Sequence, residues 1–398
     1  MAGIYLHIPF CKSKCGYCGF YSLPSIKLKD KFLEALKQEI DQRADYLNGV
    51  TVGTIYFGGG TPSLLNADEI RDLLKLISDH YDIAKDPEIT LEANPDTLSL
   101  AYLKALREIG INRLSIGIQS FFDNDLQYLG RKHDANHARQ CLVWAKQAGF
   151  ENLSIDLIYG LPTSNADQWN RNLDLFFEAN IPHLSAYALT LEPNSILTKQ
   201  IELGKALPVS EDDALRDYDI LCRRAAENGF LHYEISNFCQ SGWHSKHNAS
   251  YWFGTPYLGL GPSAHSFDGK SRQWNFSSVE KYYNAFCHCE QSEAIQTTKI
   301  DCCVVPSRND KNPRGMSEKE QLTPEQLYDE YVMLRLRTHW GIDLKWLKRE
   351  MGERFSSYCE QQAQPLIQQG KLTQTREFLY LNDHQMLFAD GVAEALFC

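Results

Sequence analysis

Short apolar runs alternate with amphipathic stretches from Ile4 to about Gly229. Buried parallel strands read as continuous apolar runs, and apolar residues spaced three or four apart indicate helices. The expected strands are 4–8, 54–57, 88–93, 113–119, 153–159 and 183–189, and the expected helices are 29–47, 67–81, 100–109, 136–148, 166–179 and 211–228. Such alternation predicts an α/β fold with a parallel sheet and outer helices. Six strand–helix units would form an incomplete (β/α)6, TIM-like barrel, since closure takes eight.

Polar residues interrupt this pattern where the expected strands end. A cysteine cluster follows the first strand and "GGGTP" (58–62) follows the second. Glu92, Gln119 and Asp156 lie in or at the end of later strands. Because barrel active sites lie at the carboxyl ends of the strands, these residues predict a site at one rim.

The pattern divides the chain into four parts. Residues 1–235 form the partial barrel, and 236–286 form a connecting segment. Residues 287–315 contain four cysteines and no sustained period, which favours a disordered insertion over a zinc site. Residues 316–398 read as a smaller helical, winged-helix-like domain.

Composition and net charge argue against several classes of protein. The 398 residues carry a formal net charge of −11, which argues against nucleic acid as a partner. No run of 18 apolar residues and no secretory signal is present, so we expect a cytoplasmic protein. Thiols stay reduced in that compartment, so the 12 cysteines are not a disulfide framework, and clustered ones are candidate metal ligands or catalysts.

The cysteine cluster consists of Cys11, Cys15 and Cys18. Thiolates at i, i+4 and i+7 can hold zinc or an iron–sulfur cluster. Structural zinc sites usually take four ligands in two pairs, and no nearby histidine completes such a set. A [4Fe–4S] cluster with three cysteine ligands leaves one iron open, so the spacing favours a cluster that binds a further ligand.

Cys-x3-Cys-x2-Cys after the first strand of a six-unit barrel resembles the radical S-adenosylmethionine superfamily. The resemblance implies that the open iron binds the amino and carboxylate groups of S-adenosylmethionine. One-electron reduction then yields a 5′-deoxyadenosyl radical. The glycine run "GGGTP" is similar to the stretch that approaches the methionine amino group through backbone atoms.

Further motifs resemble the subfamily of oxygen-independent coproporphyrinogen dehydrogenase and the HemW-type haem chaperones. They read "YLHIPFC", "YFGGGTPSLL", "LEANPDTL", "RLSIGIQSF", "LGRKH" and "DLIYGLP". The resemblance implies S-adenosylmethionine contacts from Tyr5, Tyr17, Gly59, Gly60, Thr61, Glu92, Gln119, Arg131 and Asp156. Carboxylates can accept hydrogen bonds from ribose hydroxyls, and the Arg131 guanidinium can bind a carboxylate through two hydrogen bonds. Read singly, Asp156 is equally a turn residue and Arg131 a surface cation.

Two features separate the chaperones from the dehydrogenase. The dehydrogenase has a fourth cysteine, where this chain has Phe20, and a long arm before the cluster, where this chain has ten residues. "HNASYW" (247–252) resembles the HNxxYW signature of HemW-type proteins, although Gly19 replaces their frequent Asp. The resemblance implies haem contacts from His247, Asn248, Tyr251 and Trp252. His244 and His265 are competing ligands, and a purely structural His247 is the alternative.

The resemblance therefore implies a haem chaperone with a [4Fe–4S] cluster, S-adenosylmethionine and haem as cofactors. Its expected partners are haem-accepting proteins, among them membrane respiratory enzymes, and an electron donor such as flavodoxin or ferredoxin; a homodimer is compatible with it. A radical coproporphyrinogen III dehydrogenase and a radical methylase of another substrate are the alternatives. No catalytic residue is identified.

Overall fold

The computed structural model describes the chain except for residues 20, 194 and 288–315. The predicted insertion therefore lies outside the described residues. The chain forms two compact units, each built from three segments. The first unit comprises Met1–Ser13, Phe20–Pro87 and Pro256–Gln321, and the second comprises Lys14–Gly19, Glu88–Thr255 and Leu322–Cys398.

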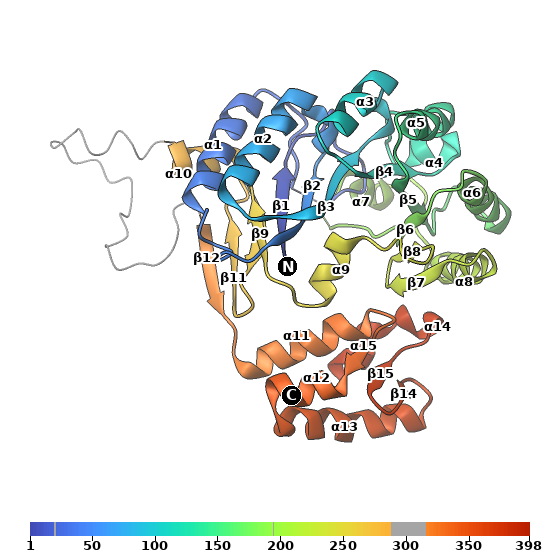
Figure 1. The fold of residues 1–398 in the computed structure, drawn as a ribbon. Helices are drawn as coiled ribbons and strands as arrows, with labels where there is room; N and C mark the ends of the chain where they lie inside the picture. The colour runs from blue at the N-terminus through green and yellow to red at the C-terminus, as the bar shows by residue number, and fades with distance from the viewer. Residues whose placement is uncertain (20, 194, 288–315) are drawn as a thin grey trace. The chain divides into compact units, whose positions relative to one another are not determined.

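The first unit is built on β1, which is parallel to its neighbours β2 and β9. Its strand order is β12-β11-β10-β9-β1-β2, with antiparallel pairing from β9 to β12. Helix α1 runs beside both α2 and α10 (Figure 1). The elements are β1 (Ala2–Ile8), α1 (Lys29–Gln42), β2 (Val52–Gly59), η1 (Pro62–Leu64), α2 (Ala67–His80), β9 (Tyr257–Leu260), β10 (His265–Phe267), β11 (Ser271–Asn275), α10 (Val279–Cys287) and β12 (Met316–Gln321).

A buried ion pair braces the first unit. Glu39 and Arg43 lie one helical turn apart in and just after α1, and Nη1 of Arg43 is 3.2 Å from Oε1 of Glu39. The same carboxylate accepts from the Asn275 side chain at 2.7 Å and from the backbone N–H of Gly261 at 2.7 Å. These charge-assisted bonds join the helix to β9–β11 through groups that would otherwise be buried without partners.

The second unit continues the parallel pattern through β3, β4, β5 and β6, and then adds β8 and β7 in antiparallel orientation. Most of its helices begin at a Ser, Asp or Asn whose side chain accepts from the third helical N–H, as at Ser99 and Asp134. The elements are β3 (Ile83–Ala93), η2 (Pro95–Thr97), α3 (Leu100–Glu108), β4 (Arg113–Gln119), α4 (Asp123–Tyr128), α5 (Ala135–Gln147), β5 (Asn152–Tyr159), α6 (Ala166–Glu178), β6 (His183–Ala188), α7 (Ile196–Glu202), α8 (Glu211–Glu227), β7 (Leu231–Glu234), β8 (Asn237–Cys239) and α9 (Lys246–Trp252).

The C-terminal part of the second unit is helical, with a small sheet ordered β13-β15-β14. It has its own apolar cluster, which includes Tyr328, Val332, Cys359 and Leu379. Its elements are α11 (Pro324–Leu336), β13 (Ile342–Asp343), α12 (Leu344–Met351), α13 (Glu353–Gln368), β14 (Thr373–Gln374), β15 (Phe378–Tyr380), α14 (Asp383–Met386) and α15 (Ala389–Glu394). Helices beside a three-stranded ribbon agree with the expected winged-helix-like module.

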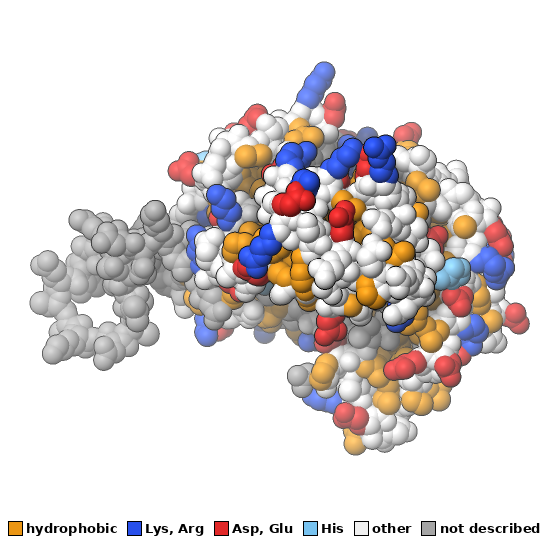
Figure 2. Space-filling model, turned by 90° about the horizontal axis from the view of Figure 1, so that it is seen from below, with side chains coloured by type: hydrophobic (Ala, Val, Ile, Leu, Met, Phe, Trp, Pro, Cys, Tyr) orange, Lys and Arg blue, Asp and Glu red, His pale blue; other side chains and the backbone are white. Residues whose placement is uncertain are grey.

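The predicted fold class is confirmed: parallel strands alternate with helices, the strand order is open, and the C-terminal region is helical. One helix is shorter than predicted. The expected helix 29–47 ends at Gln42, and the side chain of the C-cap residue Arg43 donates to the Gly259 carbonyl at 3.0 Å. No helix among the described residues is long and apolar enough to cross a membrane. Acidic and basic side chains are interspersed over the face shown in Figure 2.

Candidate functional site

The three cysteines are divided between the two units, so each is described with its own neighbours. Cys11 follows β1 and its N–H donates to the Leu23 carbonyl at 2.9 Å. The buried Thr61 hydroxyl donates to the Cys11 Sγ at 3.5 Å. Gly60 packs so closely that a Cβ there would lie 2.6 Å from the carbonyl oxygen of Phe10. The glycine run therefore lies directly against the segment that carries Cys11.

Tyr5 and Gly59 meet at a histidine that the sequence analysis did not single out. The Tyr5 hydroxyl is 3.1 Å from Nδ1 of His7, and Nε2 of His7 is 3.1 Å from the Tyr21 carbonyl. Gly59 has φ +104°, and a Cβ there would lie 2.6 Å from the His7 ring. Burial lowers the pKa of His7, so the neutral ring joins β1 to the loop after it.

Arg131 orients the second cysteine. Its Nη1 donates to the Cys15 Sγ at 3.4 Å, while Nη2 donates to Oδ1 of Asn94 at 2.7 Å and to the Gly117 carbonyl at 2.8 Å. A Cβ at Gly117 would lie 3.3 Å from the Arg131 Nη2. Three acceptors thus fix the guanidinium, which places a cationic donor against the Cys15 sulfur.

The segment Lys14–Gly19 is held by backbone bonds within the second unit. The Gly16 N–H donates to the Leu129 carbonyl at 3.2 Å, and its carbonyl accepts from Leu197 at 2.8 Å. Burial raises the pKa of Tyr17, so its phenol stays protonated, and Tyr17 packs beside Leu129 and Leu197. Cys15 and Cys18 are both half-buried, and neither forms a disulfide bond.

Predicted polar residues share one face of β3–β6. Glu92 pairs with Ser115 and Asp156 pairs with Ser185, and laterally paired residues of parallel strands point to the same side. The Ser115 hydroxyl donates to Oδ1 of Asp156 at 3.2 Å. Burial raises the pKa of Asp156, and the Ser115 bond and the nearby Arg113 charge oppose that rise.

Gln119 ends β4 in a strained conformation. Its φ is +66°, a region that residues other than glycine seldom adopt, and the side chain is buried. Such strain persists where surrounding structure imposes it, often at ligand sites. The backbone therefore directs Gln119 away from regular strand geometry at the rim where the sequence analysis placed it.

Two buried side chains on the same face have polar atoms without partners. Thr90 and Arg113 are paired across β3 and β4, and 0% and 1% of their surfaces are exposed. Among the described residues, none bonds to the Thr90 Oγ1 or to the Arg113 Nε and Nη1. Buried polar groups normally have hydrogen-bond partners, so the unpaired donors on this face are available to a bound group.

The residues present fit the chemistry of the implied cofactors. Half-buried cysteines without disulfide bonds, next to a hydroxyl and a guanidinium donor, suit iron–sulfur ligation, and Gly60 places only backbone against the segment that carries Cys11. Within the part of the chain that the structure describes, no three His, Cys, Asp or Glu side chains converge on a single-ion site.

The HNxxYW segment forms α9. Ser245 caps it by accepting from the Asn248 N–H at 3.3 Å, and the Glu88 carboxylate accepts from the His247 N–H at 2.9 Å. Nε2 of His247 lies 2.9 Å from the Tyr251 hydroxyl. The His247 side chain is 1% exposed, and burial together with the Arg113 charge lowers its pKa to about 3. The structure thus brings the four signature residues together but points His247 inward.

The competing histidines have different surroundings. His244 is half-buried and its ring centroid is 6.1 Å from that of Tyr233. His265 is exposed on β10 of the first unit and stacks on Trp274 at 5.8 Å.

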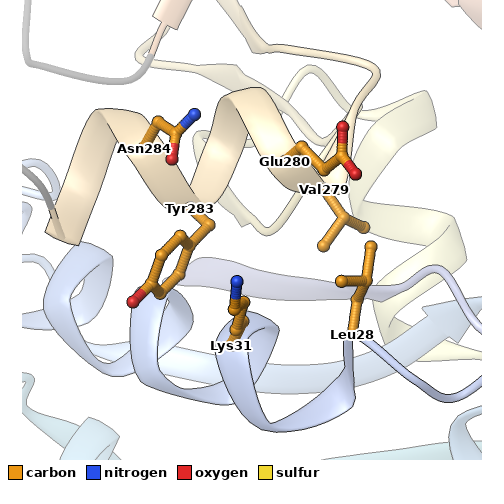
Figure 3. Close-up of a pocket in the computed structure, with 6 residues that line it drawn as sticks. All are labelled: Leu28, Lys31, Val279, Glu280, Tyr283 and Asn284. Carbon is orange, nitrogen blue, oxygen red and sulfur yellow. The ribbon is translucent and has the colours of Figure 1, made fainter.

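A surface groove lies between α1 and α10 (Figure 3). It is lined by Leu28, Lys31, Val279, Glu280, Tyr283 and Asn284. Nζ of Lys31 lies 5.3 Å from the Tyr283 ring centroid. None of the predicted site residues lines this groove, so it is not the candidate site.

Two regions match known families. Residues 5–176 match the Radical SAM superfamily, and residues 322–388 match the HemN C-terminal domain. The structure of "Coproporphyrinogen III oxidase (HemN) from Escherichia coli" aligns with a TM-score of 0.80 at 24% identity, covering 100% of this chain and 90% of that one. At that identity the likeness shows a shared fold.

Similar proteins match over nearly their whole length. The heme chaperone HemW of Mycobacterium tuberculosis (strain H37Rv) is 32% identical over 99% of this chain and 94% of its own. HemW of Bacillus subtilis (strain 168) is 30% identical, covering 98% of both chains. HemW of Escherichia coli (strain K12) is 30% identical, covering 98% of this chain and 97% of its own.

Proposed function

Because this chain belongs to the HemW family of the radical S-adenosylmethionine superfamily, we propose that it is a haem chaperone that binds haem and delivers it to haem-accepting proteins. The carrying observation is the similarity to proteins named heme chaperone HemW along almost the full chain, which includes the α9 signature. Haem is the ligand, and the acceptors include membrane respiratory enzymes.

The proposed cluster ligands are Cys11, Cys15 and Cys18. A [4Fe–4S] cluster supplies single electrons and an open iron when bound. The Thr61 hydroxyl donates to the Cys11 sulfur and the Arg131 guanidinium donates to the Cys15 sulfur, so two of the proposed ligands have hydrogen-bond donors beside them.

The proposed S-adenosylmethionine site keeps the residues that the family resemblance implies. Its residues are Tyr5, Tyr17, Gly59, Gly60, Thr61, Glu92, Gln119, Arg131 and Asp156. Glu92 and Asp156 accept hydrogen bonds from ribose hydroxyls, and Ser115 orients Asp156 for that task. Gly59 and Gly60 let backbone groups approach the ligand, since neither has a side chain in the way.

Oxygen-independent coproporphyrinogen dehydrogenase is the second candidate. The HemN-like fold and the HemN C-terminal domain favour it. Against it stands Phe20 where the dehydrogenase has a fourth cysteine, although residue 20 lies outside the described part of the chain. For the haem chaperone we also propose a flavodoxin or ferredoxin as electron donor, a cytoplasmic location and a homodimer.

Anaerobic reconstitution followed by two parallel assays tests the proposal. We expect saturable haem binding by its Soret band, and no conversion of coproporphyrinogen III above a Cys15→Ala control. Absence of saturable haem binding would refute the chaperone, and conversion above the control would establish the dehydrogenase. In the same preparation, Cys11→Ala, Cys15→Ala and Cys18→Ala should each abolish the iron–sulfur absorption.

A further inference from the structure

Gln119 lies at the centre of a very tight turn at the end of β4. The Ser120 N–H donates to the Ile118 carbonyl at 2.9 Å, so this hydrogen bond encloses Gln119 alone. With φ +66° at Gln119, the three residues form a γ-turn of positive φ, which is rare because it is strained. Such a turn persists only where its neighbours are held in place, so the position of the Gln119 side chain depends on the groups that bind the residues on either side.

Asn172 on α6 binds the two residues that follow the turn. Its Oδ1 accepts from the Phe121 N–H at 2.7 Å, and its Nδ2 donates to the Ser120 hydroxyl oxygen at 3.2 Å. Asn172 is 1% exposed, so water does not compete for either bond. One amide group thus fixes a backbone donor and a side chain directly after Gln119.

Asp125 on α4 holds the same serine. Its Oδ2 accepts from the Ser120 hydroxyl at 2.7 Å and from the Gln168 amide at 2.9 Å, and its Oδ1 accepts from the Thr163 hydroxyl at 2.7 Å. Asp125 is fully buried, and a buried carboxylate is stable only when such bonds are present. Ser120 is therefore held by both Asp125 and Asn172, which keeps it from rotating to relax the turn.

The residue before the turn is held by the histidine of "LGRKH", which is not among the proposed S-adenosylmethionine contacts. Nε2 of His133 donates to the Ile118 carbonyl at 3.1 Å. Burial, together with the Arg131 charge, lowers the pKa of His133 to about 4, so the ring is neutral. A Cβ at Gly117 would lie 2.9 Å from Nε2 of Gln119, so the glutamine amide lies directly against the backbone that Arg131 also contacts. Supports on both sides of the turn thus fix Gln119 close to a second proposed contact.

We infer that Asn172 is a positioning residue for S-adenosylmethionine: it binds Ser120 and Phe121 and thereby keeps Gln119 in the conformation that contacts the ligand. The inference rests on the proposed S-adenosylmethionine site and adds to it a residue of α6 that lies in none of the recognised motifs. Because Asn172 acts through Gln119, its effect on the ligand should disappear when the Gln119 side chain is removed. This dependence separates positioning from a general contribution to folding.

A double-mutant cycle in the full-length protein with its reconstituted cluster tests the inference. The affinity for S-adenosylmethionine is measured through the EPR signal of the reduced cluster. Asn172→Ala should lower the affinity about tenfold, because two buried hydrogen bonds that hold the turn are lost. Gln119→Ala should also lower it. In the Gln119→Ala background, Asn172→Ala should cause no further loss beyond about twofold.

Asn170→Ala is the matched control. Asn170 lies two residues earlier on α6, where its side chain donates to the Ala166 carbonyl at 2.8 Å and accepts from the Arg224 guanidinium at 2.9 Å. Its substitution should leave the affinity unchanged. Far-UV circular dichroism and iron–sulfur absorption check folding and cluster content in every variant.

A milder variant decides the case if Asn172→Ala misfolds. Ser120→Ala removes the hydroxyl that joins Asn172 to Asp125, and it should weaken binding only while the Gln119 side chain is present.

The outcomes separate this inference from the proposed function. If the EPR signal of the wild-type cluster does not respond to S-adenosylmethionine, the proposed site fails and the inference fails with it. If the wild type responds and Asn172→Ala keeps its affinity, this inference alone fails. An equal loss in the presence and absence of the Gln119 side chain would show a purely structural role and would also overturn it, as would wild-type affinity in Gln119→Ala.

Discussion

Arg43 in the first unit and Arg113 in the second are both buried, and they differ in the hydrogen bonds that their guanidinium groups make. In the first unit, Arg43 bonds to Glu39, to the Gly259 carbonyl and to the Ser266 hydroxyl. In the second, Arg113 is 1% exposed, and no described residue accepts from its Nε or Nη1. A buried charge without a partner destabilises a fold. The first arginine therefore stabilises packing, whereas the second leaves two guanidinium nitrogens on a buried face without an acceptor among the described residues.

The partners of the two arginines lead to the same conclusion. The Glu39 carboxylate also accepts from the Tyr282 hydroxyl at 2.5 Å, so α1, the strands after it and α10 share one network. Arg113 instead lies near Asp156, His183 and His247, where its charge shifts their pKa values without a bond. One network stabilises packing, and the other sets the electrostatics of the proposed cofactor face.

The largest expected effect comes from removing the Glu39 carboxylate that is paired with Arg43. Glu39→Ala leaves Arg43 buried without its carboxylate, so the free energy of unfolding should fall by about 3–5 kcal/mol. Urea denaturation of the apo protein measures it. Adding Arg43→Met to Glu39→Ala should recover part of the loss. A change below about 1 kcal/mol in the single variant would show that the pair does not brace the first unit.

Next comes the carboxylate on the face of the second unit. Asp156→Asn should lower S-adenosylmethionine affinity by about 10- to 100-fold, because charge-assisted hydrogen bonds contribute roughly 1.5–3 kcal/mol. Titration of the reduced cluster's EPR signal measures the affinity. The control is Ser154→Ala, which changes a residue two positions before Asp156 on β5. Equal affinities for wild type and Asp156→Asn would remove Asp156 from the proposed site.

Replacing Arg113 should change the free energy of unfolding by less than replacing Glu39, and in the opposite direction. Arg113→Met removes a buried cation whose Nε and Nη1 have no acceptor among the described residues, so apo stability should stay equal or rise. The Arg113 charge also holds down the pKa of Asp156, which burial raises. Without it the carboxylate protonates at a higher pH, and S-adenosylmethionine binding should be lost at a higher pH as acid is added. Arg113→Lys, which keeps the charge, should resemble wild type; a strongly destabilised Arg113→Met would refute the comparison.

The smallest effect is expected at Thr61. Thr61→Val removes one hydroxyl donor to the Cys11 sulfur and keeps the shape, which is a change of about 1 kcal/mol. Iron content should be retained while the cluster's reduction potential falls, because fewer hydrogen bonds stabilise the reduced form. Thr61→Ser should keep the wild-type potential. Complete loss of iron in Thr61→Val would mean that the hydroxyl has a larger role than sulfur donation.

The repeating part of the fold could be predicted because long periodic segments determine it. Helix α4 (Asp123–Tyr128) escaped prediction because six residues contain fewer than two turns of pattern. Strand β9 was missed because Tyr257–Leu260 reads as part of a glycine-rich loop, and its pairing with β1 is remote in sequence. The contacts of the Arg43 side chain are with residues more than 200 positions away, so no local signal predicts its inward position.

Part of the proposed site could be predicted from the sequence. Cysteine spacing and the glycine run are local signals, and the structure gives Cys11 and Cys15 donors that suit them. Arg113 and Ser115 were missed because "RLSIGIQ" was read as an apolar strand, although its polar residues alternate with period two. His7 was missed for the same reason. The burial of His247, which is 1% exposed, was not predictable because composition and spacing do not reveal packing.

The close approach at Gly60 has a consequence for protein engineering. Gly49 adopts φ +73° with no atom within 4 Å of an added Cβ, so a library should accept Asn there. At Gly60 the added atom would meet the backbone oxygens of Phe10 and Ile8, at 2.6 Å and 2.9 Å. Backbone cannot swing aside as a side chain can. Selected libraries should therefore hold glycine alone at position 60, however permissive the selection.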